Sequence, residues 1–406
     1  MNEFNLLDEY SVPENPYALV TEELVKDALK NDKGSDVTYQ NNGAKLQDYF
    51  VAKLNPLRPD SAFTEAMEQL YTRETVILSS IIGGMNKQLK TLKLDKIKTP
   101  KLLSRSIEKG KEAFIAENLK TQGFRMYDRR IGLDLNHTLL VLNELGRFHA
   151  SSILLEEELY PKTLLETFKG FERTYLDRNH SSFEGYSKLF SAAADNAKNF
   201  LQNADPKYEE CVKWLKKHRH EMVDIYLEAF STKKPFDVLT HCDCWTNNFL
   251  FRYNEDEIPV DIRFVDLQLA VKGSPAADLN YFFYTSINKD FRLKNLNTML
   301  TTYYESFCNV LRRGGRQPPF TYPELKEEIK DKKLFGFVCG LLILPIILGE
   351  GEEIFDVSNF TADKIDEFNQ QQSKKFEKLA QREGPFKDRY LVMFDEMIES
   401  NVFKEN

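Results

Sequence analysis

Four polar residues follow two short apolar segments in the middle of the chain. His241, Asp243 and Asn248 come after the first segment, and Asp266 comes directly after the second. A carboxylate such as Asp243 can orient an attacking hydroxyl and accept its proton. The oxygens of Asn248 and Asp266 are of the kind that Mg²⁺ prefers. Because transfer of a phosphoryl group from ATP has these two requirements, the sequence predicts a phosphotransfer site with Asp243 as the base and Asn248 and Asp266 on Mg²⁺. His241 is expected to brace the loop through hydrogen bonds.

A plainer interpretation of the same residues is structural. Asp243 and Asn248 could cap a turn, and Asp266 could simply end a strand. The functional interpretation is favoured because three separate chemical requirements coincide. The pair Cys242 and Cys244 could also suggest a thiolate metal site, but no further Cys or His stands at ligand spacing nearby, which argues against structural zinc.

A lysine and a glutamate in the first part of the chain add to this site. Lys53 follows the apolar stretch 49–52, a position from which its ammonium could reach nucleotide phosphates. Glu74, on the helix expected next, could hold that ammonium by an ion pair. Taken alone, a strand lysine and a helix glutamate are typical of a solvated surface. The functional interpretation of this pair therefore depends on the polar residues downstream.

The elements that must position these residues differ along the chain. Up to residue 119 the pattern predicts a helix at 21–30, strands at 36–39, 49–54 and 111–119, a turn at 41–43, and a helix from about 61 to 80 that ends at the breaker Gly83-Gly84. The remainder predicts helices, interrupted by strands at 236–240 and 262–265 that flank the polar residues.

Length and pattern together predict two lobes. A chain of 406 residues exceeds the size at which one core keeps growing. We expect a nucleotide-binding N-terminal lobe at 1–118 and a catalytic and substrate-binding C-terminal lobe at 119–406. The fold class is α+β, with an antiparallel sheet in the small mixed lobe and mostly helices in the larger one. The active site is expected in the cleft between the lobes.

Composition and charge argue against several classes of protein. The formal net charge of −8 opposes general attraction to nucleic acid or anionic membranes. The apolar run 334–348 is shorter than the roughly 20 residues that span a bilayer, so it predicts a buried helix and no membrane span. Five cysteines do not resemble a disulfide framework. The N-terminus lacks a secretory signal pattern, so a cytoplasmic location is expected. No obligate protein partner is evident.

Several motifs together resemble the ecdysteroid-kinase-like family, also called CHK kinase-like, which is related to aminoglycoside phosphotransferases and choline kinases. The resemblance runs nearly end to end and implies a two-lobed, protein-kinase-like fold. It rests on the segments 51–56, 114–119, 145–151, 241–248, 264–268 and 273–279, and on Tyr71 with Glu74.

The resemblance also implies roles for single residues. Asp243 would be the catalytic base, and Asn248 and Asp266 would be Mg²⁺ ligands. Lys53 would contact the phosphates and pair with Glu74.

Other residues would bind adenine or support the loop. The hinge, formed by Glu117, Asn118 and Leu119, would meet the adenine of ATP with its backbone. Asp278 would begin a helix and hold the catalytic loop in place, and His149 is expected to be buried and structural.

Two positions depart from the family pattern. The family has glycine after the loop histidine, where this chain has Cys242, and a side chain there is expected to alter the loop geometry without removing a ligand. The family also has a glycine followed by Asp-Asn-Tyr-Ala-Ser before the first hairpin. Here only Gly34, at 33–36, corresponds to it, which implies a loosened or differently built phosphate-covering turn.

The expected activity is transfer of the γ-phosphoryl of ATP to a hydroxyl of a small molecule, an ecdysteroid or another hydroxylated lipophile or xenobiotic. The altered glycine turn keeps open an alternative, a pseudokinase-like protein that binds a small molecule or nucleotide with weakened turnover. A third alternative, choline or ethanolamine kinase activity, would need anionic and aromatic residues that converge on a cationic headgroup, and the sequence does not place them.

Overall fold

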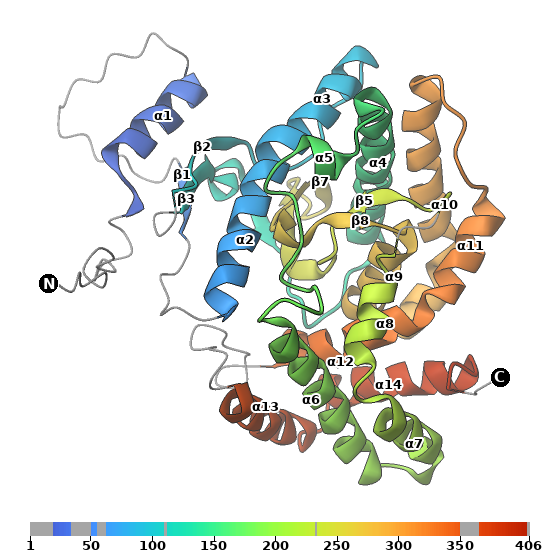
Figure 1. Cartoon of the computed structure of the whole chain (residues 1–406). Coiled ribbons are helices and arrows are strands. Elements are labelled where there is room, and N and C mark those ends of the chain that lie inside the picture. The colour runs from blue at the N-terminus through green and yellow to red at the C-terminus, as the bar shows by residue number, and fades with distance from the viewer. Residues whose placement is uncertain are drawn as a thin grey trace, which may run out of the picture.

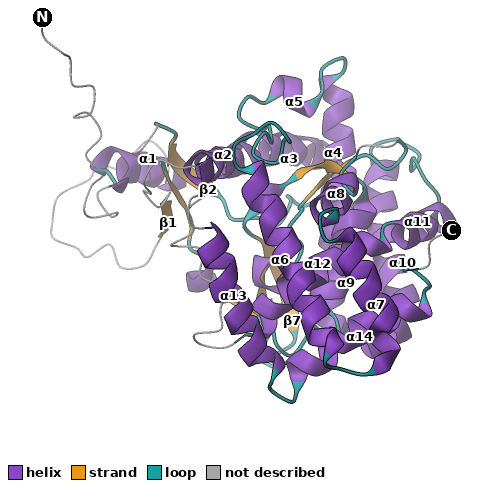
Figure 2. Cartoon of the chain, turned by 60° about the horizontal axis from the view of Figure 1, so that its bottom comes forward, coloured by secondary structure: helices purple, strands orange, loops and turns teal. Residues whose placement is uncertain are grey.

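The computed structural model describes residues 19–33, 50–54, 62–108, 112–231, 234–349 and 365–403. Within these ranges, a small antiparallel sheet with one helix beside it lies at one side of a much larger helical part (Figure 1). Strands are few and short, and helices make up most of the molecule (Figure 2). The α+β class is therefore confirmed.

The N-terminal sheet contains the strands β1 (Phe50–Leu54), β2 (Leu102–Ser106) and β3 (Ala113–Glu117) in the order β1-β3-β2, all antiparallel. The helix α1 (Glu22–Lys33) packs on this sheet through a small apolar cluster that includes Leu24 and Leu103. These elements confirm the helix predicted at 21–30 and the strands predicted at 49–54 and 111–119. The predicted strand at 36–39, the turn at 41–43 and Gly34 lie outside the described residues.

The helix predicted from about 61 to 80 does not end at Gly83-Gly84. The helix α2 (Ala62–Val76) passes through a single π-helical turn, η2 (Ile77–Ile81), into α3 (Ile82–Thr91), which contains both glycines. The prediction was wrong because the glycines do not reverse the chain. The absence of a side chain at Gly84 allows close helix packing instead. A Cβ on Gly84 would lie 2.7 Å from Leu155 Cδ1 of α4 (Leu135–Leu159), so glycine allows α3 to approach α4 closely.

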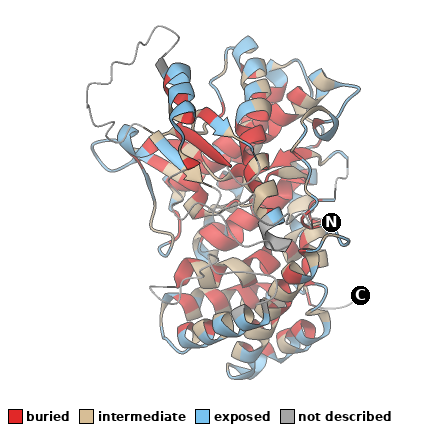
Figure 3. Cartoon of the chain, turned by 60° about the vertical axis from the view of Figure 1, so that its left-hand side comes forward, coloured by how far each residue is buried: buried red, intermediate tan, exposed pale blue. Residues whose placement is uncertain are grey.

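The larger part is built around α4, which packs along α10 (Lys289–Arg313). Their crossing is close, since a Cβ on Gly146 would lie 2.5 Å from the carbonyl oxygen of Tyr303. The other helices are α5 (Leu164–Thr167), α6 (Phe183–Gln202), α7 (Glu209–His218), α8 (Met222–Glu228), α9 (Pro275–Ser286), α11 (Tyr322–Asp331), α12 (Lys333–Leu348), α13 (Ile365–Ala380) and α14 (Pro385–Glu399). Figure 3 shows that buried residues gather inside this part and that exposed residues cover its outer helices.

Two small sheets interrupt these helices. The strands β4 (Phe124–Met126), β6 (Phe249–Tyr253) and β7 (Pro259–Phe264) form one antiparallel sheet, and β5 (Val238–Thr240) pairs with β8 (Val271–Gly273). The strands predicted at 236–240 and 262–265 are thus confirmed as β5 and β7, whereas β2, β4, β6 and β8 were not predicted. Short 3₁₀ turns follow several strands, namely η3 (Leu119–Gln122), η5 (Thr246–Asn248) and η6 (Leu267–Leu269), and η4 (Pro206–Tyr208) precedes α7.

The apolar run at 334–348 forms α12, most of whose side chains are buried. Among the described helices, none combines the length and the apolar character needed to cross a membrane. All five cysteines are buried and free, as expected of a chain without a disulfide framework. The strand β3 of the N-terminal sheet ends at Glu117, next to the predicted lobe boundary. The division into lobes at 1–118 and 119–406 stays a prediction.

Candidate active site

An ion-pair cluster joins the N-terminal sheet to the strand β7. Lys53 Nζ, on β1, lies 2.5 Å from Glu74 Oε2 of α2 and 2.8 Å from Asp266 Oδ1, which follows β7. Burial lowers the pKa of Lys53, but the two carboxylates more than offset this effect and leave the pKa above its ordinary value. Burial also raises the pKa of Glu74, against the opposing effect of Lys53. The structure therefore brings together three of the predicted site residues.

The loop after β5 is fixed by a single buried carboxylate. Asp278, in the first turn of α9, accepts the backbone N–H of His241 at 2.6 Å and that of Cys242 at 2.8 Å. His149 Nε2 lies 3.0 Å from the same carboxylate, and His149 Nδ1 lies 2.8 Å from the hydroxyl of Tyr303. The loop, α9, α4 and α10 are thereby connected through fully buried polar groups.

Asp243 is held at both carboxylate oxygens. The hydroxyl of Tyr281 donates to Oδ1 at 2.7 Å, and the side-chain amide of Asn248 donates to Oδ2 at 2.7 Å. Burial raises the pKa of Asp243, nearby Asp266 raises it further, and the two hydrogen bonds lower it. The carboxylate is oriented by neighbours that do not themselves carry a charge.

Tyr281 was not predicted from the sequence. A signal for it was present, because Tyr281 stands three residues after Asp278 on the expected helix, and positions three apart share a helix face. Asp278 and Tyr281 therefore reach the same loop, one at its backbone and the other at the carboxylate of Asp243.

Asn248 and Asp266 provide oxygens suited to a hard cation. Asn248 uses its amide nitrogen to bind Asp243, which leaves Oδ1 as the ligand atom, and Asp266 uses Oδ1 to bind Lys53. The backbone N–H of Val265 donates to the carbonyl of Asn248 at 3.0 Å, so the two segments are tied together. Within the described residues no cluster of three or more His, Cys, Asp or Glu could hold a metal. A bound Mg²⁺ would thus need phosphate or water oxygens as well.

Cys242 adopts the backbone conformation that glycine would have. Its φ is 66°, in the left-handed region, and its buried thiol lies 3.5 Å from the hydroxyl of Tyr226. The side chain expected to change the loop is therefore accommodated, at the cost of local strain. His241 braces the loop as its Nε2 donates to the carbonyl of Val265 at 3.1 Å.

The predicted hinge belongs to the same sheet as Lys53. Glu117 pairs with Phe50 at the start of β1, and its carboxylate accepts the backbone N–H of Lys101 at 3.1 Å. Asn118 caps η3 by accepting the backbone N–H of Lys120 at 3.0 Å, and Leu119 is buried. The hinge is thus connected to β1 through backbone pairing.

Arg73 is a second site-supporting residue that the sequence did not reveal. This fully buried side chain precedes Glu74 and donates only to carbonyl oxygens, including Gln268 at 3.1 Å and Glu172 at 2.6 Å. Burial lowers its pKa. Arg73 therefore ties α2 to the segment after Asp266, and its hydrogen bonds in the described part of the chain go to backbone carbonyls, which a sequence pattern could not have shown.

Comparisons with known proteins identify a family. A family profile described as "Ecdysteroid kinase-like family" matches residues 35–315. A comparison with curated protein sequences finds no significant match.

Solved structures give looser matches. A choline kinase from Cryptosporidium parvum Iowa II is 14% identical, with a TM-score of 0.37 and 80% of both chains covered. A choline/ethanolamine kinase family protein from Mesorhizobium loti is 13% identical, with a TM-score of 0.35 and 80% of this chain and 84% of that chain covered. An ADP-bound aminoglycoside phosphotransferase is 14% identical, with a TM-score of 0.32 and 87% of this chain and 99% of that chain covered.

Proposed function

Since the chain belongs to the ecdysteroid kinase-like family, a family of small-molecule phosphotransferases, we propose that it transfers the γ-phosphoryl of ATP to a hydroxyl of a small molecule. The observation that carries this proposal is the geometry of Asp243, whose two oxygens are held by Tyr281 and Asn248 at 2.7 Å each. An oriented carboxylate, together with a half-buried lysine that pairs with a second carboxylate, is the arrangement that phosphoryl transfer requires.

In the proposed reaction, Asp243 orients the acceptor hydroxyl and accepts its proton. The hydroxyl oxygen forms a bond to the γ-phosphorus while the bond from that phosphorus to the β–γ bridging oxygen breaks, and ADP leaves. Lys53, whose pKa is raised by Glu74 and Asp266, stays charged and is expected to meet the phosphates. The backbone of Glu117, Asn118 and Leu119 would bind the adenine, between an N-terminal lobe at 1–118 and a C-terminal lobe at 119–406.

Asn248 would hold Mg²⁺ through its Oδ1, and Asp266 would hold it through its carboxylate. The ion would supply neutralisation of the phosphate charge when bound. His241 and Asp278 take no part in the chemistry under this proposal. They keep the loop in the shape that presents Asp243 and Asn248 to the same space.

The acceptor class that we propose is an ecdysteroid or another hydroxylated lipophile or xenobiotic, in keeping with the family's description. A panel of steroid, sugar, choline and antibiotic alcohols, incubated with ATP and Mg²⁺ and analysed by mass spectrometry, identifies the acceptor by the mass of an added phosphoryl group. We expect addition to a steroid or similar lipophile. Addition to choline alone would contradict this class but not the reaction.

The reaction itself is tested by Asp243→Asn. This change keeps the size of the side chain but replaces one acceptor oxygen by an NH2 group and removes the base, so we expect phosphoryl transfer to fall by at least about a hundredfold with an unchanged circular dichroism spectrum. The matched control is Asp237→Asn, a carboxylate of the same part of the chain that pairs with Lys272, and it should leave turnover intact. Full turnover by Asp243→Asn would rule out the proposed mechanism.

A further inference from the structure

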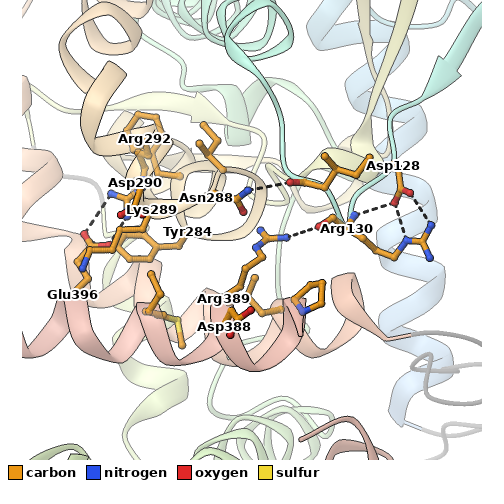
Figure 4. A pocket seen from close by; sticks show the side chains of 17 residues that line it. Asp128, Arg130, Tyr284, Asn288, Lys289, Asp290, Arg292, Asp388, Arg389 and Glu396 are labelled. Atoms are coloured by element: carbon orange, nitrogen blue, oxygen red, sulfur yellow. Dashed lines mark hydrogen bonds and ion pairs between the residues drawn. The ribbon is translucent and has the colours of Figure 1, made fainter. Parts of the chain in front are cut away.

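A cavity of about 670 Å³ lies apart from every residue assigned above to phosphoryl transfer. Its walls come from α14, from the junction between α9 and α10, from the loop at 128–131 and from Leu344 of α12 (Figure 4). This volume is within the range of pockets that enclose small organic molecules. The apolar part of the wall consists of Ile131, Phe283, Ile287, Leu344, Val392 and Met393.

Most of the charged groups around the cavity are already paired with one another. Glu396 is bound by Arg292 and accepts the hydroxyl of Tyr284 at 2.7 Å, and Lys289 pairs with Glu399 at 2.9 Å. On the opposite wall Arg130 pairs with Asp128 at 2.7 Å. Each of these charges therefore already has a partner of opposite charge within the protein.

Arg389 is the exception. Figure 4 shows its guanidinium extending from α14 toward the loop of Arg130. It donates to two carbonyl oxygens, at 3.1 Å to Thr285 and at 3.5 Å to Arg130, and within the described part of the chain no carboxylate forms an ion pair with it. Burial, with no negative charge to offset it, lowers the pKa of Arg389 to about 10.

The remaining carboxylates of the wall do not neutralise this cation. Asp290 and Asp388 are both exposed to solvent, whereas Arg389 is half-buried. A half-buried guanidinium without a carboxylate partner in the described part of the chain is less well compensated than one at the surface. An anion bound there would form charge-assisted hydrogen bonds of the strong kind.

We propose that this cavity binds a small amphiphile with one anionic group, such as an aryl sulfonate or carboxylate. Arg389 would hold the anion, and the apolar wall would cover the body of the molecule. This binding is separate from the proposed phosphotransfer, because the ligand needs neither ATP nor a hydroxyl, and its test does not depend on turnover.

The test uses two fluorescent probes that share one body. 8-Anilinonaphthalene-1-sulfonate carries a sulfonate, and N-phenyl-1-naphthylamine lacks it. Titrated into the full-length protein, the sulfonate probe should bind at one site at least about tenfold more tightly than the neutral probe, although the neutral probe is the more hydrophobic. Equal affinities, or tighter binding of the neutral probe, would overturn the proposal without any substitution.

Variants then place the site. Arg389→Met should weaken the sulfonate probe about tenfold or more and change the neutral probe less than twofold, and Arg389→Lys should keep most of the affinity. Val392→Trp, which fills the cavity, should weaken both probes. The matched control is Arg316→Met, an exposed arginine paired with Glu157, and it should change neither. If Arg389→Met weakens both probes alike or neither, or if Val392→Trp leaves both unchanged, Arg389 is a structural link between α14 and α9 and the proposal is wrong.

Discussion

Cys242 and Asp266 are both held in the left-handed backbone region, with φ of 66° and 60°. Cys242 directly precedes the predicted base Asp243, and Asp266 is near enough to raise the pKa of Asp243. Aspartate tolerates that conformation better than most residues, whereas cysteine does not. The strain at Cys242 is therefore a local cost that the surrounding hydrogen bonds must offset.

Replacing Cys242 measures that strain. Cys242→Gly and Cys242→Ala both remove the thiol beside Tyr226, so the difference between them isolates the backbone. Glycine avoids a left-handed penalty of roughly 1–2 kcal/mol but adds about 0.4–1 kcal/mol of chain entropy to the unfolded state. We expect the glycine variant to be more stable than the alanine variant by about 0.5–1 kcal/mol in urea denaturation. An alanine variant of equal or greater stability would contradict the strain.

Tyr281→Phe tests how much the orientation of Asp243 matters. Phenylalanine keeps the buried ring but removes the hydroxyl that donates to Asp243 Oδ1. The loss of a hydrogen bond to a charged group, about 1.5–3 kcal/mol, should lower kcat by about tenfold or more while KM for ATP changes less than threefold. Steady-state kinetics with the acceptor that the panel of alcohols identifies check this. A rise in KM for ATP with unchanged kcat would show that Tyr281 acts on nucleotide binding instead.

At the scale of elements, glycines distinguish packing from chain reversal. Gly83 has no heavy atom within 4 Å of the place where a Cβ would stand, whereas a Cβ on Gly146 would lie 2.5 Å from a backbone carbonyl of α10. A backbone group cannot turn aside as a side chain can, so the contact between α4 and α10 depends on Gly146.

Alanine at the two positions should therefore have opposite effects. Gly83→Ala should raise the free energy of unfolding by about 0.5–1 kcal/mol, because alanine favours a helix interior. Gly146→Ala should lower it by about 1–3 kcal/mol through overpacking. Chemical denaturation of both variants beside the wild type gives the comparison. If both changes stabilise the protein, α4 and α10 do not meet as described.

The same glycines show what the sequence could and could not predict. Gly83-Gly84 has the composition of a helix end, and only the approach of Leu155 from a distant helix explains why the helix continues. The strands β5 and β7 were predictable because their apolar runs end at polar residues. Their partners β8 and β6 were not predicted: β8 has only three residues, and the apolar start of β6 directly follows the polar loop that ends at Asn248.

Some residues of the candidate site could be predicted from the sequence and others could not. Residues with distinctive chemistry, such as Lys53, Asp243 and Asp266, could be named from type and spacing. Arg73 could not be named in this way, because its hydrogen bonds go to backbone carbonyls. Every residue has a backbone carbonyl, so the sequence does not mark these partners.

At the scale of the whole molecule, Lys53 connects segments that are far apart in the chain. Its ammonium lies between Glu74 of α2 and Asp266 after β7. The ion pairs of Lys53 therefore connect the N-terminal sheet with the segment that follows β7. A ligand that engages this charge should therefore stabilise both parts together.

Nucleotide binding provides the corresponding prediction. A ligand that binds only the native state raises stability in proportion to RT ln(1 + [L]/Kd), so Mg²⁺-ATP at about 100 times its Kd should add about 2.7 kcal/mol and raise the melting temperature by several degrees. Lys53→Met should abolish most of this shift. Lys26→Met, which alters an exposed pair with Glu22 on α1, is the matched control. No shift with the wild-type protein at millimolar nucleotide would exclude ATP as the phosphoryl donor.

Asp278 has a consequence for what the loop tolerates at position 242. This one carboxylate accepts the N–H groups of residues 241 and 242 from a helix about 36 positions away, so the loop receives its shape from outside its own sequence. Each charge-assisted hydrogen bond is worth about 1.5–3 kcal/mol, enough to offset the strain of a residue other than glycine. Asp278 therefore lets the loop keep its form with Cys242 in place of glycine. Glycine at position 242 is thus not required in this chain, whereas the carboxylate of Asp278 holds both N–H groups of the loop.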